Sequence, residues 1–369
     1  MRELLKIGLK NSLNTLLLLA LFLGLITVGF TDVSEAGLLP QGNAITDGKA
    51  LLRYALPIDN KPVRDLQSSL EDISTQLRAN RRWRAITSDV KQASRILEKP
   101  EKILEAVPEE HRSEAEAFIS QLQSETEQLR EIVDSKDKEQ VWIQRASLLN
   151  KVGDLEQLMV KGFPFKVPSE YSYLPQLKGR ATVEIKTNRG TIRMVADGYS
   201  APVTAGNFVD LVQRGFYDGL EFTRSEESYV VQTGDPPGKE QGFIDPKTKK
   251  YRAIPLEILV EGDEAPTYGT TLEEAGRYLE MPVLPFSAYG GVALARPESD
   301  ANGGSSQFFF FLFQPELTPA GRNLLDGRYA IFGYVVEGKD VLGEIRAGDK
   351  IESAKIIEGI ENFVKPQAA

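Results

Sequence analysis

Two stretches in the second half of the chain decide its fold class. Residues 222–235 read FTRSEESYVVQTGD, and residues 291–312 read GVALARPESDANGGSSQFFFFL. Both contain short runs of apolar and aromatic residues bounded by Gly, Asp or Ser, which is the pattern of strands separated by turns. Side chains alternate along a strand, so the four phenylalanines at 308–311 are expected to send two rings into a core and two to the opposite face.

The segments around these stretches complete a domain. Residues 181–195 alternate apolar and polar side chains about an Asn-Arg-Gly turn, which predicts a hairpin. A helix is expected over 201–215, and a Tyr-Asp-Gly turn follows at 217–219. Near the end of the chain, 325–333 read LDGRYAIFG, and a second helix is expected near 340–346.

These motifs, in this order, resemble the cyclophilins, a family of peptidyl-prolyl cis-trans isomerases. The resemblance covers residues 179–366. It implies an all-β domain, a closed antiparallel barrel of about eight strands capped by two helices.

The resemblance also implies a site for an X-Pro peptide. The X-Pro amide rotates slowly because its nitrogen lone pair is delocalised, and a rigid, permanently charged donor aimed at that nitrogen favours the twisted state. Arg224 matches the family's catalytic arginine, and Gln232 matches the glutamine that orients it. No cofactor is implied. The positions matching the family's substrate contacts are Tyr229, Val230, Ala295, Gln307, Phe309, Leu324, Leu325 and Tyr329.

Several of these positions depart from the family pattern. Tyr229 replaces a frequent phenylalanine, Val230 a methionine, Leu324 a tryptophan and Tyr329 a histidine. The indole is a major contact for cyclosporin in the family, so weak cyclosporin binding is expected. Residues 236–290 form an insertion that is expected to border the site and to gate or occupy it.

These departures leave two interpretations of the function. One is an isomerase of low activity, supported by the retained Arg224 and Gln232. The alternative is a catalytically weak or inactive cyclophilin that acts as a peptide-binding assembly chaperone. Glu226 and Glu227 also allow Arg224 to be a simple surface ion pair.

The N-terminus has the order of an export signal. Arg2, Lys6 and Lys10 precede an apolar run over 16–30, and small residues follow near Ala36. A signal peptide is therefore predicted over 1–36, with a retained membrane anchor as the alternative. Either reading predicts an exported protein.

The segment after the signal is predicted to be a helical bundle over 37–162. Apolar residues recur at helical spacing, first at 66, 70, 73 and 77 and again at 86, 90, 93 and 97. Ser113 and Glu116 have the spacing of a capping box, and Asp137 is expected to begin the last helix. Residues 163–178 are predicted to be an ordered linker. The helical half is expected to pack on the C-terminal half and limit access to the site.

Composition and architecture narrow the class of protein. A net charge of −9 argues against nucleic acid as a partner, and a chain with one histidine and no cysteine argues against a histidine-dependent catalytic triad or a thiolate metal site. The domain order resembles the multidomain cyclophilins of the thylakoid lumen that support photosystem II assembly. That resemblance implies a location in the thylakoid lumen or periplasm. It also implies X-Pro segments of exported or membrane proteins as partners, photosystem II core subunits among them.

Overall fold

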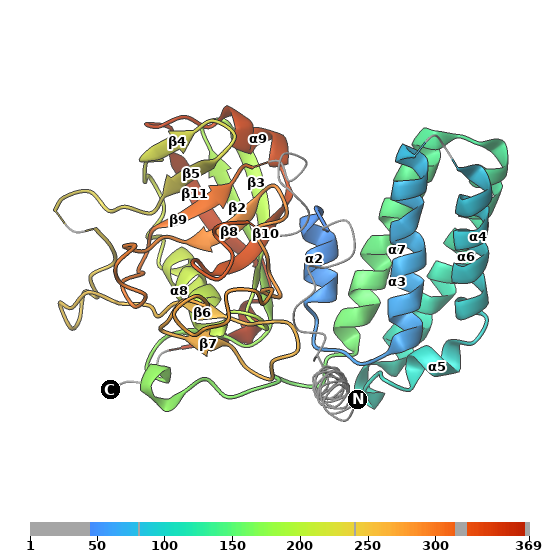
Figure 1. Cartoon of the computed structure of the whole chain (residues 1–369), viewed down its shortest axis with the longest axis horizontal. Coiled ribbons are helices and arrows are strands. Elements are labelled where there is room, and N and C mark those ends of the chain that lie inside the picture. The colour runs from blue at the N-terminus through green and yellow to red at the C-terminus, as the bar shows by residue number, and fades with distance from the viewer. Residues whose placement is uncertain (1–44, 80–81, 240, 314–322, 366–369) are drawn as a thin grey trace, which may run out of the picture. The chain divides into compact units, whose positions relative to one another are not determined.

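The computed structural model describes residues 45–79, 82–239, 241–313 and 323–365, so the predicted signal peptide lies outside the described residues. The first half of the described chain is helical (Figure 1). Among the described residues, no helix has the length and apolar character needed to cross a bilayer. The helices of this half are α2 (Gly48–Tyr54), α3 (Lys61–Arg78), α4 (Trp83–Leu97), α5 (Pro100–Leu104), α6 (Arg112–Ser135) and α7 (Lys138–Leu158).

Four of these helices form a bundle with its own core. Helix α3 contacts α4 and α7, and α6 contacts α4 and α7, so the four close into a ring. The two predicted stripes, at 66, 70, 73 and 77 and at 86, 90, 93 and 97, are buried in that core. The bundle fold predicted from helical periodicity is therefore confirmed.

The helix ends were predicted less well than the helix faces. Asp137 caps α7, because its carboxylate accepts a hydrogen bond from the Gln140 amide at 3.0 Å. The capping box at Ser113 was wrong. A 3-10 turn at Glu109–His111 runs directly into α6, so Ser113 already lies inside the helix and makes no cap.

Helix α2 packs against the second half of the chain and was not recognised in the sequence. Leu51 and Leu52 belong to the same buried cluster as Tyr334 and Ile331. The backbone of α2 lies close to β10 at this point, since a Cβ added to Gly48 would lie 2.8 Å from the Tyr334 Cβ. Seven residues are too few to establish a helical period, which explains why this element was missed.

The second half is an eight-stranded antiparallel sheet in the order β11-β2-β3-β10-β8-β9-β5-β4. The sheet curls (Figure 1), and an antiparallel bridge between Glu221 and Lys350 joins its two edges. This arrangement confirms the barrel implied by the resemblance. The strands are β2 (Arg180–Thr187), β3 (Gly190–Asp197), β4 (Arg224–Glu226), β5 (Val230–Thr233), β8 (Gly291–Leu294), β9 (Phe308–Phe311), β10 (Ile331–Glu337) and β11 (Ile351–Glu358).

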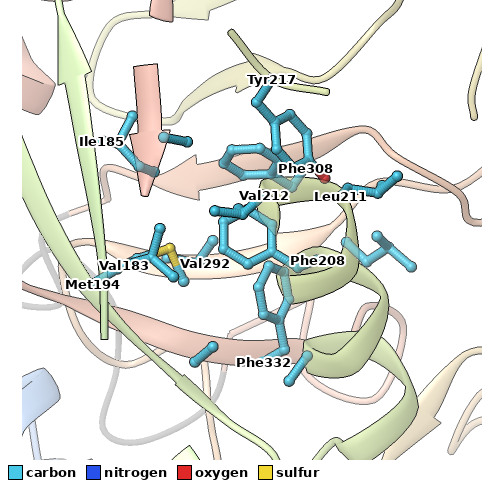
Figure 2. Packing of buried hydrophobic residues seen from close by; sticks show 14 of the residues in the cluster. Val183, Ile185, Met194, Phe208, Leu211, Val212, Tyr217, Val292, Phe308 and Phe332 are labelled. Atoms are coloured by element: carbon cyan, nitrogen blue, oxygen red, sulfur yellow. The ribbon is translucent and has the colours of Figure 1, made fainter. Parts of the chain in front are cut away.

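Two helices accompany the sheet, α8 (Pro202–Gln213) and α9 (Lys339–Glu344). Figure 2 shows Phe208 of α8 among the core side chains, with ring centroids 5.1 Å from Phe308 and 5.2 Å from Phe332. Phe308 and Phe310 lie in this core, whereas Phe309 and Phe311 lie in a second cluster on the other face. The expected alternation along β9 therefore holds, and it brings Phe309 to the site described next.

The linker packs on the barrel through its aromatic residues. Phe163 stacks with Tyr199 at 6.4 Å, and Tyr171 stacks with Tyr268 at 5.4 Å. Two 3-10 helices, Ser169–Tyr171 and Ile360–Asn362, and four short strands lie outside the main sheet. The short strands are β1 (Gln176–Leu177), which pairs with β12 (Phe363–Val364), and β6 (Glu257–Ile258), which pairs with β7 (Thr267–Tyr268).

Candidate active site

The register of four strands gathers the predicted site residues into one row. Arg224 on β4 lies opposite Gln232 on β5, Gln232 lies opposite Phe309 on β9, and Phe309 lies opposite Ala293 on β8. A cavity of about 270 Å³, called the cup below, lies on this row. The residues that line the cup are Arg224, Tyr229, Val230, Gln232, Ala295, Arg296, Phe309, Leu325 and Tyr329.

Every residue predicted for the site lines the cup except Gln307 and Leu324. Gln307 sits beside it, where its side-chain oxygen accepts a hydrogen bond from the Gln232 amide at 2.7 Å. Its own amide donates to an Asp235 carboxylate oxygen at 3.0 Å. Gln307 therefore fixes the orientation of Gln232 and leaves the Gln232 carbonyl oxygen as the acceptor for a peptide.

Leu324 lies outside the cup. Its side chain is 88% exposed and lines a separate cavity of about 460 Å³ with Leu272, Tyr278 and Arg328. The neighbouring Leu325 lines the cup instead, because consecutive side chains of this turn point in different directions. The structure thus does not bring Leu324 together with the other predicted contacts.

One edge of the cup, the β4 rim, consists of Arg224, Glu226 and Tyr229. The Arg224 Nε donates to the Glu226 Oε1 at 2.6 Å, and the Arg224 Nη2 lies 2.6 Å from the same oxygen. Both side chains are about half exposed, at 48% and 49%. The Arg224 Cζ also lies 5.9 Å from the Tyr229 ring centroid. The ion pair considered from the sequence therefore exists, and it involves a residue that lines the cup.

The opposite edge, the turn rim, consists of Arg296, Leu325 and Tyr329. The sequence reasoning did not select Arg296. Its Nε and Nη2 donate to the Arg328 carbonyl at 3.0 and 2.7 Å, and its Nη1 donates to the carbonyls of Pro297 and Glu298 at 2.8 and 3.0 Å. The one feature of the sequence that could have pointed to Arg296 is its position directly after Ala295, which was already assigned to the site.

The floor of the cup is aromatic and largely buried. Phe309 meets Tyr329 edge to face, with centroids 5.7 Å apart and planes at 84°. On its other side Phe309 stacks on Phe286 at 6.1 Å. Such ring pairs prefer defined geometries, so the floor has a fixed shape suited to an apolar ring.

The insertion supports the turn rim from behind. The Leu272 amide donates to the Gly327 carbonyl at 2.9 Å, and the Phe286 amide donates to Asp326 Oδ1 at 2.7 Å. An ion pair at 2.7 Å joins Glu273 to Arg328. No residue of the insertion that the structure describes lines the cup, so its described part braces the site and does not fill it.

The described residues of the helical half also contribute no side chain to the lining of the cup. Their nearest contribution is through α2, whose Leu51, Leu52 and Ala55 share the buried cluster of Phe309. The helical half is therefore linked to the site through packing of the cluster below it.

Chemically, the cup combines an apolar pocket with two guanidinium groups and one carboxamide. The pocket accepts a proline-sized ring, and Gln232 accepts a backbone hydrogen bond. Arg224 supplies a planar cationic donor at the edge. Such an arrangement can hold a bound X-Pro amide next to a hydrogen-bond donor.

Comparisons with known proteins agree with this description. Residues 182–361 match the model of the cyclophilin-type peptidyl-prolyl cis-trans isomerases, and residues 47–160 match that of the CYP38-like, PsbQ-like domain. The chain is 59% identical to a putative thylakoid lumen peptidyl-prolyl cis-trans isomerase of Synechocystis, over 97% of this chain and 95% of that protein. It is 46% identical to the chloroplastic isomerase CYP38 of Arabidopsis thaliana, over 90% of this chain and 79% of that protein.

A third relative, the chloroplastic isomerase CYP37 of Arabidopsis thaliana, is 34% identical over 89% of this chain and 72% of its own length. The sequence identity extends over both halves of the chain. It agrees with the barrel and with the row of residues from Arg224 to Phe309. The chain belongs to the cyclophilin-type peptidyl-prolyl cis-trans isomerases.

Proposed function

We propose that this protein catalyses rotation about X-Pro bonds in exported or membrane proteins of the thylakoid lumen, with Arg224 as the catalytic donor. The observation that carries the proposal is the row formed by Arg224, Gln232 and Phe309 across three adjacent strands. In this row a cationic side chain, a carboxamide that can accept a hydrogen bond from the peptide backbone, and an aromatic ring line one cavity.

In the proposed mechanism the proline ring lies on Phe309, between Tyr329 and Val230. Gln232, held by Gln307, accepts a hydrogen bond from the peptide backbone. Arg224 leaves Glu226 and donates to the proline nitrogen as the amide twists and its lone pair becomes localised. The donor then binds the twisted state more strongly than either planar isomer, which lowers the barrier.

The location and the clients form a further part of the proposal. Support comes from the names of two relatives, one described as a thylakoid lumen isomerase and the other as chloroplastic. We propose X-Pro segments of photosystem II core subunits as clients during assembly. The signal peptide predicted over 1–36 would direct this export.

A second candidate function is a peptide-binding chaperone with little or no turnover. The observation that favours it is the ion pair between Arg224 and Glu226, which holds the donor on a side chain of the protein itself. A peptide then binds to the cup without receiving the hydrogen bond needed for rotation.

The test is exchange spectroscopy by NMR on a capped Ala-Ala-Ala-Pro-Ala-Ala peptide with the full chain and with Arg224→Ala. The isomerase proposal expects exchange well above the spontaneous rate for the native chain and near that rate for the variant. Equal rates for the two proteins, with binding retained, would reject catalysis by Arg224 and support the chaperone. No exchange and no binding by the native chain would reject both functions.

A further inference from the structure

Arg296 places a positive charge at the cup that forms no ion pair with a described residue. The Glu274 carboxylate interacts with it electrostatically from a longer distance and accepts hydrogen bonds from Thr271. Arg224 is paired with Glu226, and Arg328 is paired with Glu273. Within the described ranges, Arg296 has no carboxylate at ion-pair distance. Its hydrogen bonds go to three backbone carbonyls, which are neutral.

The guanidinium of Arg296 is also held in one orientation. Four of its hydrogen bonds end on backbone oxygens, and its Cζ lies 5.1 Å from the Tyr329 ring centroid. A guanidinium carries five N–H donors, so one remains for a ligand. Because the side chain is already ordered, a ligand that uses this donor loses little affinity to side-chain ordering.

The distance between the two rims matches a short peptide. Arg224 and Ala293 are separated by three steps between neighbouring strands, or roughly 14 Å at the usual spacing of about 4.8 Å. Arg296 follows Ala293 by three residues, just after the end of β8, and it lines the same cup as Phe309. An extended peptide rises roughly 3.3 Å per residue. We therefore expect a side chain one or two residues from a proline seated on Phe309 to reach Arg296.

We infer that the cup prefers X-Pro segments that carry Asp or Glu within two residues of the proline, and that Arg296 sets this preference. The inference rests on the proposed isomerase function, because it names the class of substrate for the same site. The carboxylate of the client pairs with the free donor of Arg296, while the proline amide is presented to Arg224. A charge-assisted hydrogen bond of this kind is stronger than one between neutral groups.

The test uses the full chain and capped six-residue peptides built on Ala-Ala-Ala-Pro-Ala-Ala. At each of the two positions on either side of the proline, one alanine is replaced by Glu or by Gln, which has nearly the same shape. For the Glu peptide and the Gln peptide at each position, NMR exchange measures kcat/KM, and NMR titration measures the Kd of the complex with the protein. The expected result is that kcat/KM for the Glu peptide exceeds that for the Gln peptide by about two- to fivefold in at least one position, since a partly exposed charge pair contributes at most about 1 kcal/mol. This Glu-to-Gln ratio should fall in 0.5 M salt, because ions screen exposed charges.

Variants separate the charge of Arg296 from its structural role. Arg296→Gln should bring the ratio to about one, and Arg296→Lys should keep part of it, because lysine retains the charge and loses the planar fork. Arg95→Gln removes the same charge from an exposed position on α4 and should leave the ratio unchanged.

Three outcomes would overturn the inference. The first is equal kcat/KM for the Glu and Gln peptides at all four positions while the neutral peptide is still turned over. The proposed function would then stand without the acidic preference. A ratio that persists in Arg296→Gln would assign the preference to another residue. Absence of binding and exchange with every peptide would remove the proposed function and this inference together.

Discussion

The β4 rim and the turn rim each place an arginine over a tyrosine ring, but they hold the two guanidinium groups differently. Arg224 is bound by one carboxylate, that of Glu226, and both partners are about half exposed. Arg296 is bound by the carbonyls of Arg328, Pro297 and Glu298. The sequence motif identified the first arginine, and the fold alone revealed the second.

Because the two arginines have different partners, we expect their side chains to differ in mobility. An exposed ion pair contributes at most about 1 kcal/mol, so Arg224 can exchange Glu226 for a substrate at small cost. Several backbone hydrogen bonds together with ring stacking keep Arg296 in place. We therefore expect the β4 rim to supply a donor that leaves Glu226 when a substrate binds, and the turn rim to present a fixed charge.

The largest expected effect comes from removing each arginine in turn. With the neutral alanine peptide, Arg224→Ala should lower kcat/KM by about 10²- to 10³-fold, because loss of one hydrogen-bond donor to the reacting group typically raises the barrier by about 2.7–4 kcal/mol. Arg296→Ala should lower it by less than about tenfold, since the neutral peptide offers no partner for its charge. Steady-state exchange rates at matched protein concentrations give both values. Equal decreases in kcat/KM for the two variants would contradict the proposal that Arg224 is the catalytic donor and Arg296 is not.

The next effect concerns cyclosporin and the turn that carries Leu325. Leu324 points away from the cup, so the drug should bind weakly to this protein. Leu324→Trp should change the Kd by less than about threefold, because a side chain that lines a separate cavity buries little surface against a drug in the cup.

Calorimetry measures this change, and Leu279→Trp is the matched control. Leu279 is also an exposed leucine and lies in the insertion. A gain of about tenfold or more in Leu324→Trp alone would contradict the placement of residue 324 outside the cup.

A third prediction addresses the insertion that braces the turn rim. Glu257 is buried and accepts hydrogen bonds from the amides of Val203 and Thr204 at the start of α8. Burial raises its pKa from 4.5 to about 7 in spite of these donors. The folded state therefore binds a proton that the unfolded state releases between these two pH values. The stability contributed by the protonated group is complete below about pH 4.5 and is lost as the pH rises through about 7.

Thermal melts of the native chain and of Glu257→Gln between pH 4.5 and 8 test this linkage. The native chain should lose stability relative to the variant as the pH rises, because the glutamine does not ionise. The difference between the two proteins is the quantity to follow, since burial also raises the pKa of Glu156 to about 7. A difference that stays constant across this range would contradict the assignment to Glu257.

The smallest effect on catalysis is expected at the β4 rim itself. Glu226→Gln should raise kcat/KM by about two- to fivefold, because it removes a competitor for Arg224 that is worth at most about 1 kcal/mol. Glu227→Gln is the control, since Glu227 is exposed and adjacent and has the same charge. The gain over the native chain should shrink in 0.5 M salt, which already weakens the native ion pair. A lower rate in Glu226→Gln would mean that Glu226 positions Arg224 for catalysis.

The prediction from sequence succeeded where the signal is local. The stripe from Leu66 to Leu77 and the alternation of Phe308 to Phe311 follow from periods of 3.6 and 2, and both were found in the structure. Arg224 and Gln232 were placed in one site because the resemblance matched both to the family's active-site residues, and the strand register pairs them directly. Their catalytic roles stay predictions that the proposed experiments test.

The sequence by itself thus determined the helical and barrel halves, the β4 rim and the turn-rim positions Leu325 and Tyr329, because each depends on a local period or on a recognisable motif. Only the tertiary structure decided the strand register of the cup, the place of Arg296 and the bracing of the turn rim. Arg296 is held by the carbonyl of Arg328, 32 residues away, and the turn is braced by Leu272 from the insertion. No periodicity encodes such contacts, because they form between irregular segments brought together only when the barrel has closed.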